Sequence, residues 1–218
     1  MTPESVLIAA LHARDEWRYD DVVALVDPAS RDERFQSFCD MSRPMTIERF
    51  AEHYPELTGD TLAGAYSRWR EQTKDPEANI THFLPGITSY AELIELDAAT
   101  FLARWMANED DRAFLVKRLR ERDRAVPAWL LGVPDGKEYV VIGSVYEDHD
   151  LAHVLYRWVF HRVGEEPSRG PVEYEALRRQ ADGGWRLVAD HFSFLQGRGG
   201  TSTILGEEFA DLWDGEPD

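Results

Sequence analysis

Two histidines stand four residues apart in the segment VYEDHDLAHVLYRWVF, and an acid, Asp150, directly follows the first. This spacing is close to that of a zinc-protease helix, in which two histidines one turn apart bind the metal. The residues after His153 are β-branched and aromatic, however, and these types favour a strand. Residues four apart on a strand lie roughly 13 Å apart, too far to share one ion. We therefore expect a β-hairpin with His149 in its turn, and we expect no metal site.

Asp190 and His191, in the segment WRLVADHFSFL, are the second pair that could carry chemistry. Neighbouring residues of a strand point to opposite faces, so one of the two should face the core. A carboxylate among apolar side chains has a raised pKa and can act as a general acid or base. Tyr156 would then supply a hydrogen-bond donor. A structural role for the inward residue, hydrogen-bonded within the protein, is the competing interpretation.

Residues 151–160 alternate between two faces of a strand. One face is apolar apart from a tyrosine hydroxyl and should meet the helices; it consists of Ala152, Val154, Tyr156, Trp158 and Phe160. His153 and Arg157 lie on the opposite face. That face could be solvated, packed by the end of the chain, or covered by a second copy of the protein, and in the last case His153 and Arg157 are the interface candidates.

Helix and strand patterns occupy separate parts of the chain. Residues 1–35 contain two helix patterns, and residues 36–126 look helical almost throughout. After Pro127 the character changes to four β-rich runs with turn-like links: EYVVIGSVY, LAHVLYRWVF, VEYEALRRQ and WRLVADHFSFL. Consecutive strands with short links predict an antiparallel meander. A glycine-rich and acidic segment, 197–218, follows.

Composition excludes several classes of partner. The 218 residues include 41 acidic and 24 basic ones, so the net charge is −17. Such a protein repels phosphate backbones and anionic lipid, and we expect neither nucleic-acid nor membrane binding. The one cysteine, Cys39, cannot form a disulfide within the chain and is expected to be an inert buried thiol. Without a basic leader or a long apolar run, the sequence suggests a cytoplasmic protein.

The two ends of this plan resemble the NTF2-like superfamily, which includes the SnoaL-like and ketosteroid-isomerase-like proteins with their cystatin-like cone. The opening LIAALHARDEWRYDDVVALVDP is similar to that family's start, and VEYEALRRQADGGWRLVADHF is similar to its last two strands. The resemblance covers about half of the chain. It implies an α+β fold in which a curved antiparallel sheet packs on N-terminal helices. The superfamily hosts enzymes and binding modules alike, so the fold does not give the function.

We accordingly expect an NTF2-like domain formed by residues 1–35 and 127–196, with a helical insertion at 36–126. The leading functional expectation is a non-catalytic domain, without a cofactor, that binds a small apolar ligand between sheet and helices. One alternative is an isomerase, cyclase or dehydratase that uses Asp190 or His191 as proton carrier. The other is a homodimeric protein-interaction module.

Overall fold

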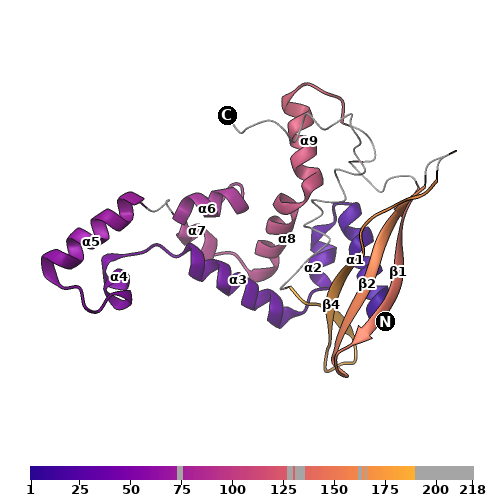
Figure 1. Cartoon of the computed structure of the whole chain (residues 1–218), viewed down its shortest axis with the longest axis horizontal. Coiled ribbons are helices and arrows are strands. Elements are labelled where there is room, and N and C mark those ends of the chain that lie inside the picture. The colour runs from indigo at the N-terminus through magenta and orange to yellow at the C-terminus, as the bar shows by residue number, and fades with distance from the viewer. Residues whose placement is uncertain (73–75, 127–129, 131–135, 162–163, 165, 190–218) are drawn as a thin grey trace. The chain divides into compact units, whose positions relative to one another are not determined.

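The computed structural model describes residues 1–72, 76–126, 130, 136–161, 164 and 166–189 (Figure 1). The chain divides into two compact units, of which the first contains Met1–Arg34 and Ala98–Asp218 and the second contains Phe35–Asp97. The second unit begins next to the expected start of the helical insertion but ends well before residue 126. That this unit is an insertion into an NTF2-like domain remains a prediction.

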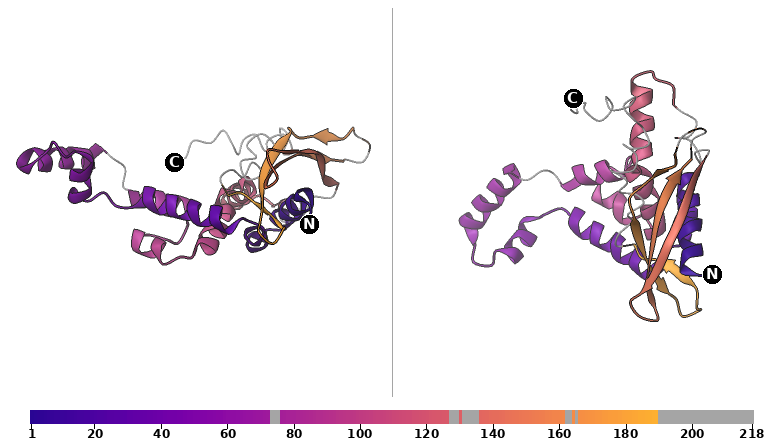
Figure 2. Two further views of the ribbon diagram at one scale, coloured as in Figure 1. Left: turned by 90° about the horizontal axis from the view of Figure 1, so that it is seen from below. Right: turned by 45° about the vertical axis from the view of Figure 1, so that its right-hand side comes forward.

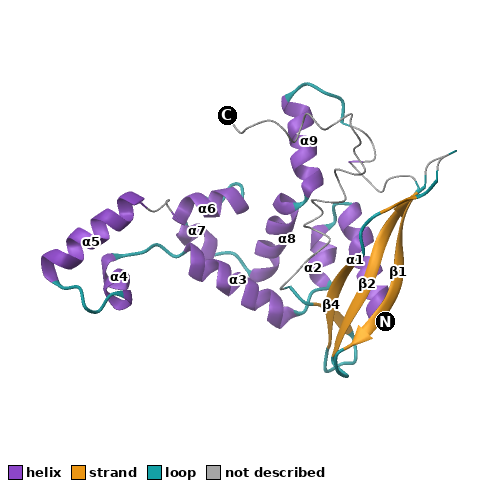
Figure 3. Cartoon of the chain, viewed as in Figure 1, coloured by secondary structure: helices purple, strands orange, loops and turns teal. Residues whose placement is uncertain are grey.

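The sheet of the first unit is antiparallel and open, which confirms the α+β class (Figure 3). Its described strands lie in the order β1, β2, β4, β5, and β3 pairs with β2. The strands are β1 (Lys137–Tyr146), β2 (Leu151–Phe160), β3 (Ser168–Arg169), β4 (Glu173–Arg179) and β5 (Trp185–Leu187).

The expected four-strand meander is correct in its order of neighbours but needs two corrections. The link after β2 folds back and forms β3. Strand β2 has ten residues and β4 only seven, so the C-terminal end of β2 is not paired with β4 and pairs with β3. The last strand is described over Trp185–Leu187 alone, since the amide of Ala189 turns away to the hydroxyl of Ser30 at 2.9 Å. The rest of the expected strand, from residue 190, lies outside the described residues.

The β1–β2 hairpin confirms the interpretation of the two histidines. The carboxylate of Asp148 accepts hydrogen bonds from the backbone N–H groups of Asp150 and Leu151, at 2.7 and 2.9 Å, and so forms the turn. His149 lies in this turn, and His153 pairs across the ladder with Val145. In the described part of the chain, no group of three or more histidine, cysteine or acidic residues is placed to hold a metal ion.

Helix α1 (Pro3–Asp15) lies against one face of the sheet, which we call the inner face (Figure 2). Thr2 caps it by accepting a hydrogen bond from the backbone N–H of Ser5. Four fully buried residues form its apolar side: Val6, Leu7, Ala10 and Leu11. Of the five residues that the alternation of β2 assigned to this face, Ala152, Val154, Tyr156 and Trp158 are buried, whereas Phe160 at the end of the strand is half-buried.

The other helices of the first unit complete this core. They are α2 (Tyr19–Ala24), α8 (Ala98–Glu109), α9 (Asp111–Glu121) and the start of α3 (Pro28–Ser42). The loop after α2 runs beside β5, where the N–H of Leu187 donates to Leu25 and its carbonyl accepts from Asp27. The first thirty residues are thereby joined to the last described strand.

The second unit is helical, with α4 (Ile47–His53), α5 (Gly59–Gln72), α6 (Pro76–Phe83) and α7 (Tyr90–Ile94) beside the rest of α3. Helices α4 and α5 pack through an aromatic cluster centred on Phe50, whose ring lies 5.6 Å from that of Tyr66 and 5.9 Å from that of Trp69. Among the helices of the described residues, none combines the length and the apolar composition that crossing a membrane requires.

Candidate functional site on the two faces of the sheet

The predicted site residues are distributed over both faces of the sheet. Tyr156 lies on the inner face, and its hydroxyl donates a hydrogen bond to Glu173 at 2.8 Å. His153 and Arg157 lie on the opposite, outer face, as expected from the alternation along β2. Asp190 and His191 lie outside the described residues, so their proposed role as proton carriers stays a prediction.

Asp110 is the centre of a buried ion cluster beside the inner face. It stands between α8 and α9 and caps α9 by accepting from the N–H of Arg112. Its carboxylate also accepts hydrogen bonds from the guanidinium groups of Arg14 and Arg112 and from the hydroxyl of Tyr19, at 2.8 to 3.0 Å. Burial alone would raise the pKa of Asp110, but the two arginines outweigh it and hold this pKa well below its usual range.

Asp15, at the end of α1, forms the second half of the cluster. Lys137 donates to both of its carboxylate oxygens, at 2.8 and 3.0 Å, and the hydroxyl of Tyr139 donates at 2.7 Å. Burial lowers the pKa of Lys137 to about 8, although the charge of Asp15 opposes the change. Burial likewise raises the pKa of the Tyr139 hydroxyl. The start of β1 is in this way joined to the end of α1.

The Asp110 and Asp15 halves are bridged by Arg112, which donates to the backbone carbonyls of Asp15 and Arg14. Its guanidinium also lies 4.7 Å from the centre of the Trp17 ring. Each charged group of the cluster therefore has an opposite charge or a backbone acceptor within reach. A buried network in which all charges are matched fixes the positions of the elements that it joins. We therefore assign this cluster a structural role, in which it holds the end of α1, the junction of α8 and α9 and the start of β1 together.

Glu173 and Tyr156 form a smaller polar pair on the inner face. Burial raises the pKa of Glu173, and the hydrogen bond from Tyr156 opposes that change. A carboxylate with a raised pKa beside a phenol has the chemistry of a general acid or base. Tyr156 therefore stays a candidate hydrogen-bond donor in the enzyme alternative, and Glu173 is a further candidate proton carrier beside it.

Sequence reasoning did not find the inner cluster, because its members are far apart in the chain. Arg14 and Asp110, for example, are separated by 96 residues, and Asp15 and Lys137 by 122. One available signal was the spacing of Lys137 and Tyr139. Two residues apart on β1, they lie on the same face, and the neighbouring strand β2 is apolar on that face. Another was Asp110, which directly precedes a helix pattern in the position of a cap.

The outer face presents apolar side chains to the solvent. Val140 and Ile142 on β1 are 38% and 47% exposed. They are continued along the same face by Val145 and by Tyr174, whose ring meets His153 edge-on at 6.0 Å. Exposed apolar residues that gather on one surface of a protein typically mark an interaction site.

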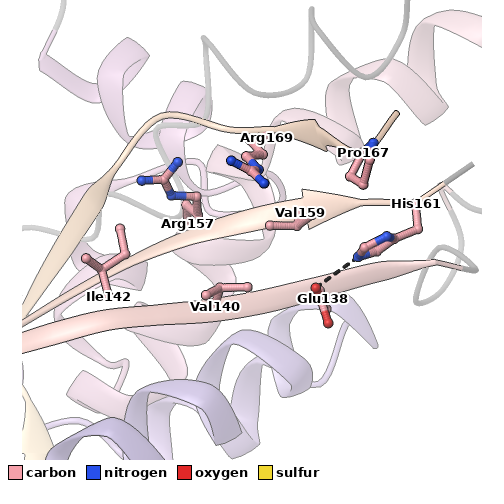
Figure 4. Close-up of a pocket in the computed structure, with 8 residues that line it drawn as sticks. All are labelled: Glu138, Val140, Ile142, Arg157, Val159, His161, Pro167 and Arg169. Carbon is pink, nitrogen blue, oxygen red and sulfur yellow. Dashed lines mark hydrogen bonds and ion pairs between the residues drawn. The ribbon is translucent and has the colours of Figure 1, made fainter. Parts of the chain in front are cut away.

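A hollow of about 340 Å³ lies at one end of the outer face (Figure 4). Strands β1, β2 and β3 contribute its lining, which consists of Glu138, Val140, Ile142, Arg157, Val159, His161, Pro167 and Arg169. Its floor is apolar, while His161 and Glu138 form an ion-pair contact of 2.9 Å at its rim. Within the described residues, Arg157 and Arg169 make no ion pair and no side-chain hydrogen bond.

The outer face thus differs chemically from the inner one, because its charged groups are only partly matched and its apolar groups are only partly covered. The matched charges of the inner face can stabilise the fold. The exposed apolar groups of the outer face, and its arginines that are unpaired within the described residues, can bind a partner. Comparisons of the chain with protein-family models, with curated proteins and with solved structures found no match.

Proposed function

We propose that the protein is a non-catalytic domain with an NTF2-like plan, and that it acts as an interaction module by forming a homodimer through the outer face of its sheet. The observation that carries this proposal is the exposed apolar surface of β1, where Val140 and Ile142 border a hollow. Burial of such surface is the main favourable contribution to association between proteins. An isologous contact uses the same patch on both copies, so one apolar surface is sufficient.

The inner face supports the non-catalytic part of the proposal. The charges of the Asp110 and Asp15 cluster have partners within the described residues, which supports a structural role for this cluster. Binding of a small apolar ligand between sheet and helices remains a prediction. Lys137 and Glu173 make that face more polar than the expectation assumed.

The mass of the protein in solution tests the proposal. At micromolar concentration, sedimentation velocity should give twice the 25.0 kDa of one chain. The variant Ile142→Asp places a charge in the contact and should sediment as a monomer, because burying an unpaired carboxylate costs several kcal/mol.

Ile94→Asp is the matched control for this experiment. Ile94 is an isoleucine of similar exposure, 51% against 47% for Ile142, but it lies on α7 and not on the sheet. This variant should remain dimeric. A monomeric wild type, or an Ile142→Asp protein as dimeric as Ile94→Asp, would refute the proposed interface.

A further inference from the structure

Arg157 and Arg169 are neighbours across the outer face of the sheet. Val159 pairs with Arg169 on β3, and Arg157 precedes Val159 by two residues on β2. The two arginines are therefore diagonal neighbours on the same face, whose Cα atoms are typically ~7–8 Å apart. Figure 4 shows both arginine side chains on the same side of the hollow. Long side chains at diagonal positions are within reach of each other, so a single carboxylate could contact both.

The chain has 41 acidic and 24 basic residues, so acids that could pair with these two arginines are plentiful. Within the described residues, however, no acidic side chain forms an ion pair with either arginine, whereas Arg14, Arg112 and Arg178 each have at least one such pair. Two like charges side by side in a hollow repel each other. A carboxylate from outside the chain would remove that repulsion and gain planar, two-pronged hydrogen bonds.

Glu138 is the acidic residue that a second copy would bring to this place. Among the described residues that line the hollow it is the only acid, and its side chain is 56% exposed. One carboxylate oxygen contacts His161 at 2.9 Å, and the other has no hydrogen bond within the described residues. The carboxylate can therefore accept hydrogen bonds from a partner without losing His161.

A twofold axis can be placed so that Glu138 of one copy meets the arginines of the other. Glu138 pairs with Val159 across the β1–β2 ladder, and Val140 pairs with Arg157. The line from Val140 to Val159 thus runs diagonally between Glu138 on one side and Arg157 on the other. If a twofold axis lies in the interface along this line, Glu138 of each copy faces Arg157 of the other, and Arg169 is within side-chain reach.

We infer that, in the homodimer, Glu138 of each copy enters the hollow of the other and binds Arg157 and Arg169. This inference rests on the proposed dimer and specifies its register. The apolar floor formed by Val140 and Val159 excludes water from the ion pairs, and pairs screened from water in this way contribute more than exposed ones. The contact occurs twice, once on each side of the axis.

Complementary charge reversals test this inference. One variant is Glu138→Arg, and the other is Arg157→Glu combined with Arg169→Glu. A homodimer of either variant would contain two repulsive contacts, one on each side of the axis. Its dissociation constant should therefore rise at least roughly tenfold. In an equimolar mixture the mixed dimer has attractive contacts on both sides of the axis. Native mass spectrometry with one variant isotope-labelled should therefore show mixed dimers and few dimers of either variant alone.

Control reversals on α5 exclude a general effect of charge. Arg68 and Glu71 are exposed residues of that helix, and Arg68→Glu and Glu71→Arg should each dimerise as the wild type does and mix at random. The same random mixing by the sheet variants would overturn the inference.

The inference and the proposed dimer can fail separately. If Ile142→Asp is monomeric but the complementary variants form no mixed dimer, the outer face is the interface and the proposed pairing of Glu138 with the arginines is wrong. If Glu138→Arg dimerises normally and only the arginine variant is impaired, the arginines bind another acid and the inference is overturned. If the wild type is monomeric, the proposed function fails, and the inference fails with it.

Discussion

At the scale of single residues, Asp110 and the arginines of the hollow show how the same ion chemistry serves two purposes. Asp110 is fully buried, and Arg14, Arg112 and Tyr19 all donate to it. Arg157 and Arg169 lie on the outer face, and neither forms an ion pair within the described residues. A matched buried charge fixes the position of its neighbours, whereas an unmatched surface charge remains available to a partner.

Replacing Asp110 by asparagine should strongly destabilise the protein. The side chain keeps its shape and can still cap α9, but Arg14 and Arg112 lose their buried counter-charge. Breaking a buried ion pair in this way typically costs about 3–5 kcal/mol of the free energy of unfolding. Urea denaturation measures the change. Asp32→Asn, which removes an exposed pair with Arg31, should cost under about 1 kcal/mol; equal effects of the two variants would contradict the assigned role.

The destabilisation should also depend on pH in a defined direction. Because the pKa of Asp110 is lower in the folded protein than in the unfolded chain, the unfolded chain binds the proton first as the pH falls. The contribution of Asp110 is complete above about pH 5 and decreases below about pH 4. The difference in unfolding free energy between wild type and Asp110→Asn should therefore shrink as the pH is lowered through this window.

At the scale of secondary structure, the β1–β2 hairpin depends on tight geometry at its open end. Gly136, just before β1, has a φ of +81°, and a Cβ there would lie 2.3 Å from the carbonyl oxygen of His161. Its own carbonyl accepts a hydrogen bond from the N–H of His161 at 2.8 Å. The residue directly before β1 must therefore be a glycine.

Gly136→Ala should lower the free energy of unfolding by about 2 kcal/mol, because the new methyl group meets backbone and the conformation is strained. Gly143→Ala, in the irregular part of β1, is the control. A Cβ at that position meets no atom within 4 Å, so the change should stay within about 1 kcal/mol of zero. Thermal or urea unfolding of both variants measures the difference, and similar values would refute the steric explanation.

The elements themselves were largely predictable from the sequence, and their contacts were not. Alternation along β2 correctly assigned Tyr156 to the inner face and Arg157 to the outer one, since a strand's period is local. The turn at Asp148 was predictable for the same reason. By contrast, β3 forms only because its backbone meets the end of β2, and the inner cluster joins residues about a hundred positions apart. The hollow arises from three strands together, and no local pattern indicates it.

At the scale of the whole molecule, net charge opposes the proposed dimer. Each chain has a charge of −17, so two copies repel each other at long range. The proposed local pairs between Glu138 and the arginines attract, but they are few, whereas the long-range repulsion comes from the net negative charge of both whole chains. Long-range repulsion is also the part that salt screens most effectively.

Moderate salt should consequently strengthen the dimer. Raising the ionic strength from about 0.01 M to about 0.1 M shortens the screening length from ~30 Å to ~10 Å, which removes most of the long-range repulsion. The dissociation constant from sedimentation equilibrium should fall several-fold over this range. Ile142→Asp should remain monomeric at both salt concentrations. A wild-type dimer that weakens steadily with salt would show that ion pairs dominate the association.

The pairing of Leu187 with Leu25 and Asp27 has a consequence for biosynthesis. Helix α1, with four apolar residues on one side, is synthesised before the sheet that packs on it, which follows more than a hundred residues later. The backbone hydrogen bonds of Leu25 and Asp27 with Leu187 can form only after residue 187 has been synthesised. Until the sheet has been made, the side of α1 that packs on it stays exposed, and binding by a chaperone in this interval would protect the nascent chain from aggregation.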